Sequence, residues 1–179
     1  MAYEDLEGLD GTFENVGGTN TQVFFAPKSD FETIAPPPEF NSGAALGDDV
    51  VITTDHVMKT GKKLLSLSML QDSGKLTSEL VGDLGGKSDS VTFEAMYVGA
   101  MKQIQGMRRR MKNDQFLFFI ALPDGTVIQI GTEDRPAMAE AGFDSGTAKE
   151  GVRSMSITVN AVSQATWIYE GTLPLTPAV

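Results

Sequence analysis

One block decides the fold of this chain: residues 89–131, with the sequence DSVTFEAMYVGAMKQIQGMRRRMKNDQFLFFIALPDGTVIQIG. Apolar and polar residues alternate across 90–98, which is the pattern of a strand with one buried face. A second apolar set recurs at the spacing of one helix face: Ala100, Ile104, Met107 and Met111. We therefore expect a strand followed by a short helix in this block.

Residues 115–122 (QFLFFIAL) are apolar on both faces. Strands of an antiparallel sheet usually keep one face in water, so the second apolar face of this segment requires a cover. The Pro-Asp-Gly sequence at 123–125 predicts a turn, and 126–130 returns as a further strand. The apolar stripe of the helix at 100–111 is the nearest candidate cover for 115–122.

The other periodic segments predict further strands, separated by turn signals every 8–12 residues or so. They are residues 21–26, 49–56, 63–70, 75–81, 136–141, 152–162 and 164–170. Residues 31–35 fit either a strand or one helical turn. Asp-Ser-Gly at 72–74 predicts a hairpin between 63–70 and 75–81. Eight or nine strands with one helix favour a mainly β fold, a β-sandwich or barrel with one flanking short α-helix.

The domain organisation follows from length and composition. A chain of 179 residues is large enough for one domain with its own core. Residues 1–20 are rich in Gly, Asp, Glu and Asn, which predicts a flexible N-terminal arm. Pro174 and Pro177 mark a C-terminal tail over 172–179. We expect a single β-sandwich domain over 21–171.

The charge of the chain is uneven. Its net charge is −10, and residues 1–60 hold eleven acidic side chains against only Lys28 and Lys59. An acidic surface repels phosphates, so this segment is either a solvated acidic surface or a contact for a basic partner. The chain has no cysteine, which excludes disulfides, thiolate zinc sites and cysteine nucleophiles.

The ends and hydropathy of the sequence predict where the chain is made. No apolar run reaches the roughly 18 residues of a membrane helix. The acidic start MAYEDLEGLDG lacks the basic-then-apolar order of a signal peptide. We therefore expect a protein made in the cytoplasm, with no membrane partner.

No motif for catalysis, metal binding or phosphate binding is complete. His56 is the only histidine, no Gly-x-Ser-x-Gly elbow accompanies it, and a surface or partly buried strand position is expected for it. Asp48, Asp49 and Asp55 lack the spacing of a calcium loop. Residues 82–88 (GDLGGKS) resemble a phosphate loop, but Val81 stands where that motif needs glycine. We expect no enzyme activity, no cofactor and no metal.

The one basic cluster lies near the C-terminal end of the predicted helix. Its members are Arg108, Arg109, Arg110 and Lys112, together with Lys102 near the start of the helix. Cations at this end complement the helix dipole, so a solvated helix face is one interpretation. The other is a subunit interface, in which these cations contact the acidic first third of a neighbouring copy. The cluster has little aromatic interleaving and is a poor nucleic-acid footprint.

The order of elements resembles a known family. An aromatic strand ends in Ala-Pro (VFFAPKSDF, 23–31), a strand ends at Gly99, and a Met-rich short helix follows. Asn113-Asp114 then leads into FLFFIALPDGTVIQIG (116–131), and RSMSITVNAV (153–162) closes the domain. Over most of residues 13–172 this resembles the major tail (tail tube) proteins of long-tailed bacteriophages, especially the small type of phages and prophages of Bacteroidetes-like hosts.

The resemblance implies a structural virion protein. Six copies would close a ring lined by a continuous β-barrel, and the rings would stack into the tail tube through which DNA leaves the head. Its partners would be itself and other tail proteins (tip, terminator and tape measure), with DNA passing through without specific binding. One polar strand face suits such a lumen, or a contact between subunits: Ser154, Ser156, Thr158 and Asn160. The flexible arms could order on a neighbour.

Two other classes of protein fit the same residues. One is a different virion component, such as a capsid decoration or tail completion protein. The other is a monomeric β-barrel that binds a small ligand. Both keep the mainly β fold and predict no tubes.

Overall fold

A computed structural model describes residues 17–147 and 151–178, and this part of the chain is mainly β with one α-helix, α1 (Met101–Met111). Two 3-10 helices accompany it, η1 (Lys28–Asp30) and η2 (Leu46–Val50). The strands are β1 (Gln22–Pro27), β2 (Phe31–Thr33), β3 (Val51–Ile52), β4 (Val57–Met58), β5 (Leu65–Ser68), β6 (Lys75–Val81), β7 (Ser88–Tyr97), β8 (Gln115–Ala121), β9 (Val127–Ile130), β10 (Ala137–Asp144), β11 (Ser154–Ser163) and β12 (Trp167–Tyr169). The prediction of a β-sandwich with one short helix is confirmed.

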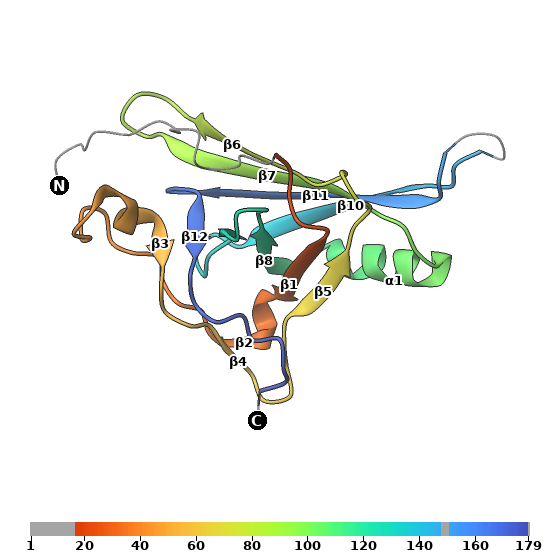
Figure 1. Ribbon diagram of the computed structural model, residues 1–179, viewed down its shortest axis with the longest axis horizontal. Helices are drawn as coiled ribbons and strands as arrows, with labels where there is room; N and C mark the ends of the chain where they lie inside the picture. The colour runs from red at the N-terminus through yellow and green to blue at the C-terminus, as the bar shows by residue number, and fades with distance from the viewer. Residues whose placement is uncertain (1–16, 148–150, 179) are drawn as a thin grey trace.

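Strand β8 is the centre of the main sheet, whose strand order is β3-β12-β9-β8-β10-β11-β7-β6. One edge of β8 pairs with β1, and the other edge pairs with both β9 and β10. The β8–β10 pairing involves only two residue pairs, Phe116 with Ala137 and Gln115 with Met138. Here the sheet divides into two layers. The first contains β10, β11, β7 and β6, and the second contains β5, β1, β8, β9, β12 and β3 (Figure 1).

The larger core lies between these two layers. Side chains from β7 and β11 meet those of β1, β5 and one face of β8. The largest fully buried members are Phe25, Phe93, Ile104, Phe118, Ile120, Ile130, Met155 and Ile157. Ile104 and Met111 of α1 belong to the same core, so the helix covers its open end. The predicted helix is confirmed, beginning one residue later than the stripe suggested.

The expectation that the helix covers the second face of 115–122 is wrong. Leu117 and Phe119, both with no exposed surface, point into a second core on the far side of β8. That core is formed by residues 31–64 together with Trp167 and Tyr169. Thus β8 is apolar on both faces because it is sandwiched between two cores, and α1 belongs to the other one.

Two strand predictions also fail. β5 and β6 do not form a hairpin: β5 pairs with β1, and β6 pairs with β7. The turn between them, with Asp72 at a φ of 60°, carries the chain from one layer to the other. Segment 49–56 is not one strand, because Asp48 and Asp49 accept backbone N–H groups of residues 41–45 and hold η2 in place.

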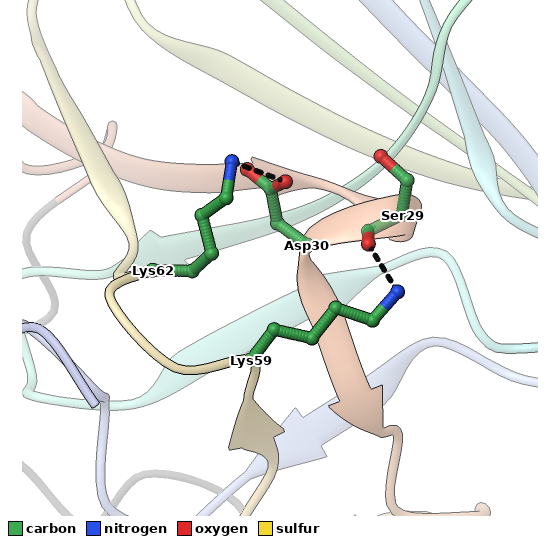
Figure 2. A network of polar contacts seen from close by, with 4 residues as sticks. All are labelled: Ser29, Asp30, Lys59 and Lys62. Carbon is green, nitrogen blue, oxygen red and sulfur yellow. Dashed lines mark hydrogen bonds and ion pairs between the residues drawn. The ribbon is translucent and has the colours of Figure 1, made fainter. Parts of the chain in front are cut away.

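Residues 172–178 are fixed to their own chain and do not form a free arm. Leu64 N donates to Pro174 O at 3.0 Å, and Ala178 N donates to Lys62 O at 3.0 Å. Figure 2 shows how the neighbouring turn is fastened: Lys62 Nζ lies 3.0 Å from Asp30 Oδ1, and Lys59 Nζ donates to Ser29 O at 2.8 Å. Residues 1–16 of the predicted N-terminal arm (1–20) lie outside the described residues.

Candidate functional site

The outward face of the first layer is polar. Ser156 and Asn160 of β11 are exposed and Thr158 is partly exposed, while Ile157 and Val159 between them are buried. The strand register places Thr158 between Glu94 of β7 and Glu140 of β10. It also places Asn160 beside Thr92, whose Oγ1 donates to Asn160 Oδ1 at 2.9 Å. The sequence-predicted polar face therefore extends over neighbouring strands.

Ser154 does not belong to this face. Its side chain is only 3% exposed, and Met155 beside it is buried as well. The alternation of exposed and buried side chains fails at this first residue of β11, where Asp144 is its partner at the end of the β10–β11 ladder. A period-two pattern read from sequence cannot reveal that failure.

The charges on the outward face are few and mostly acidic. The strand register places Lys75, Glu79, Glu94, Glu140 and Asp144 on the same side of the layer as the exposed Ser, Thr and Asn residues. Exposed apolar side chains also share this side, among them Met96, Met138 and Val162. A surface of hydroxyl, amide, apolar and sparse carboxylate groups gives phosphates little to bind.

The first layer ends in two incompletely paired strand edges. Among the described residues β6 pairs only with β7, and β10 pairs beyond Met138 only with β11. Exposed edges of this length are templates for pairing with another chain. The β10 edge is partly covered by α1, whose Arg108 donates from Nε to Ala141 O at 2.9 Å.

The structure divides the predicted basic cluster into two parts. Arg108 is half-buried, and it also donates from a terminal guanidinium nitrogen to Gln105 Oε1 at 3.1 Å. It is therefore fastened to its own chain. Arg109, Arg110 and Lys112 are exposed, and the one ion pair within the described residues joins Lys62 and Asp30 instead.

At the other end of the molecule a loop over residues 36–50 forms an apolar pocket that the sequence did not predict. Its volume is about 850 Å³, and its apolar lining includes Pro37, Phe40, Leu46, Val50 and Trp167. Phe40 is 93% exposed. The only sequence signal was an isolated aromatic residue after three prolines, which does not distinguish a pocket from an ordinary loop.

His56 is buried within the second core, at 4% exposure, and is not the surface or partly buried strand residue that the sequence suggested. Its Nδ1 accepts a hydrogen bond from Ala35 N at 3.0 Å, and its Nε2 lies 2.9 Å from Gln129 Oε1. Its ring stacks on Tyr169 at 4.7 Å with an interplanar angle of 5°. Burial lowers the pKa of His56 and raises that of Tyr169.

These contacts make His56 a neutral core residue. Nδ1 already accepts a backbone N–H, so the ring proton lies on Nε2 and is donated to Gln129. In the described part of the chain His56 hydrogen-bonds to Ala35, Tyr169 and Gln129, and none of these is a serine or cysteine nucleophile. The geometry is that of a structural clamp between residues 34–58 and β9.

Within residues 17–147 and 151–178, no group of three His, Cys, Asp or Glu side chains is placed to hold a metal ion. No helix of that part is both long and apolar enough to cross a membrane. Four features of the described residues are candidates for function: the outward face of the first layer, the two strand edges, the exposed cations of α1 and the pocket beside Phe40. Comparisons with protein-family models, curated proteins and solved structures found no match to this chain.

Proposed function

We propose that this protein is a structural subunit that assembles into hexameric rings, stacked as the tail tube of a bacteriophage. The observation that carries the proposal is the first layer, β10-β11-β7-β6, which combines a polar outward face with an incompletely paired strand at each edge. The hexameric number comes from the resemblance in sequence pattern.

The order of strands within the layer supports ring closure. All neighbouring strands are antiparallel, and the layer has an even number of strands. When such a layer is repeated around an axis, β6 of one copy lies antiparallel to β10 of the next, so the alternation continues without interruption. Pairing the parts of these edges that α1 leaves uncovered removes their unpaired N–H and C=O groups.

The chemistry of the outward face supports a DNA conduit. Exposed Ser156 and Asn160 lie among threonines and a few carboxylates, and Lys75 is the one cation in that register. A polyanion moves past such a wall because hydration and like charge prevent adhesion. The virion tail is accordingly the proposed location, and the tip, terminator and tape-measure proteins are the proposed partners.

A second candidate function is supported by one observation. The pocket beside Phe40, at about 850 Å³, lies within the range of small-molecule sites. A monomeric protein that binds an apolar ligand there would be stabilised by it. A thermal-shift panel of apolar ligands tests this alternative.

The test of the proposed function is assembly of the purified chain. We expect sedimentation at rising protein concentration to show large particles, and negative-stain microscopy to show stacked rings or tubes with a central hole. A chain that stays monomeric at every concentration, even with purified tail tips as nuclei, would contradict the proposal. The other virion roles also predict no tubes.

A further inference from the structure

The pocket beside Phe40 has an apolar floor and an acidic rim. Glu39 and Asp49 are among its lining residues. Asp48 and Asp49 each accept two backbone N–H groups of the loop, which fixes their carboxylates in place. No lysine or arginine occurs between residues 29 and 58. This charge favours a cationic occupant and disfavours the acidic N-terminal residues of the chain.

Two features of the pocket favour an occupant. Phe40 is 93% exposed beside an apolar cavity, and a partner that covered both would remove this apolar surface from water. Trp167 lines the pocket and is 4% exposed, and its Nε1–H has no hydrogen-bond acceptor in the described part of the chain. An unmet buried donor is costly, and an occupant would have to open a path to this inaccessible atom before its carbonyl could satisfy it.

The C-terminal turn of α1 has the complementary chemistry. Arg109, Arg110 and Lys112 are exposed and have no ion-pair partner among the described residues. The last carbonyl groups of any α-helix lack intrahelical donors, so this turn also offers acceptors. Figure 1 shows α1 and the β3 loop toward opposite ends of the long axis of the molecule. One copy cannot bring these two surfaces together.

We propose that the pocket receives the C-terminal turn of α1 from a second copy of this chain. The proposal rests on the proposed assembly function and names one contact within it. The aliphatic part of an arginine side chain from the second copy packs on Phe40, with its guanidinium group over the ring. Glu39 and Asp49 neutralise the charge of this guanidinium group. Each copy carries both surfaces, so the contact is heterologous and repeats from copy to copy.

Charge reversal tests this contact. We expect Arg109→Glu combined with Arg110→Glu to raise the critical concentration for assembly by about tenfold or more, since the loss of about 1.4 kcal/mol per contact has that effect. Phe40→Ser should act in the same direction. Both variants should keep the wild-type unfolding transition, because the replaced side chains are exposed. The matched control reverses Lys63 and Lys102, which lie outside the contact and should leave assembly unchanged.

A charge swap makes the test specific. Adding Glu39→Lys to the doubly reversed chain should lower the critical concentration again by at least about threefold, because the opposite charges then face each other. If the wild-type chain forms tubes and the variants assemble at the same critical concentration, the contact is overturned and the proposed function stands. The same holds if an apolar ligand fills the pocket while Phe40→Ser assembles normally. A wild-type chain that never assembles would overturn the proposed function and the contact together.

Discussion

Arg108 donates a hydrogen bond from Nε to the carbonyl oxygen of Ala141, at 2.9 Å, and so binds α1 to the edge of β10. Its neighbours Arg109 and Arg110 are exposed and make no ion pair within the described residues. Three consecutive arginines therefore differ in their contacts: Arg108 is fastened to its own chain, and Arg109 and Arg110 are exposed, as the proposed contact with a second copy requires.

This difference is measurable in the free energy of unfolding. Arg108→Ala should lower it by about 1–2 kcal/mol, because a hydrogen bond from a charged donor is lost. Arg109→Ala should change it by less than about 0.5 kcal/mol. Urea denaturation of the two variants gives the comparison, and equal stabilities would contradict the assigned role of Arg108.

The two buried faces of β8 predict two large and separate losses of stability. Phe118→Ala and Phe119→Ala should each lower the free energy of unfolding by about 3–5 kcal/mol, since each ring fills a different core. Gln115→Ala, at the exposed end of the same strand, is the control. A neutral Phe119→Ala would show that the second core is absent.

His56 predicts a dependence of stability on pH. Burial lowers its pKa in the folded protein below the ordinary value of 6.5, so the unfolded chain takes up a proton first as the pH falls. The contribution of His56 is therefore complete above pH 6.5 and declines below it. The hydrogen bond to Gln129 and the nearby Asp55 charge act against burial and reduce the lowering of the His56 pKa.

Thermal unfolding between about pH 8 and pH 5 measures this slope. His56→Leu should remove the His56 part of the slope and also lower stability by about 1–3 kcal/mol, because Ala35 N loses its acceptor. A wild-type slope identical to that of the variant would contradict the clamp.

If the outward face of β11 lines the lumen of the proposed tube, cations added to this face should bind DNA. Ser156→Lys combined with Asn160→Lys places two cations on a wall that has few, so DNA should be retained by tubes of this variant and released as salt rises. Ser156→Gln with Asn160→Gln is the neutral control. Cosedimentation of labelled DNA is the measurement, and equal retention by both variants would exclude this face from the lumen.

Much of the fold could be predicted because local periodicity determines it. The alternation across β7 and β11 and the helical stripe over α1 are visible in the sequence, and both elements form close to the expected residues. The double-sided burial of Gln115–Ala121 was also visible, as an apolar run without a wet face. The residues that pack on its second face could not be predicted, because residues 31–64 are irregular and show no apolar periodicity in the sequence.

The candidate site was predictable only in part for the same reason. Ser156, Thr158 and Asn160 followed from alternation, whereas Ser154 did not, since the pattern fails at the end of the strand. The basic cluster was visible as a run of charge. Its division between Arg108 and the exposed cations depends on Ala141, which lies 33 residues away in the chain. The pocket beside Phe40 depends on loop geometry that sequence periods do not describe.

Cross-linking between strand edges tests ring assembly most directly, because the chain has no cysteine of its own. Thr77→Cys on β6 and Glu140→Cys on β10 place one thiol at each edge of the four-stranded layer, about 14 Å apart within a copy at about 4.8 Å per strand. With a bis-maleimide linker shorter than this span, we predict a ladder of covalent multimers that ends at six, while either single variant gives none beyond a dimer. A double variant that stays monomeric in concentrated solution would contradict ring assembly through these two edges.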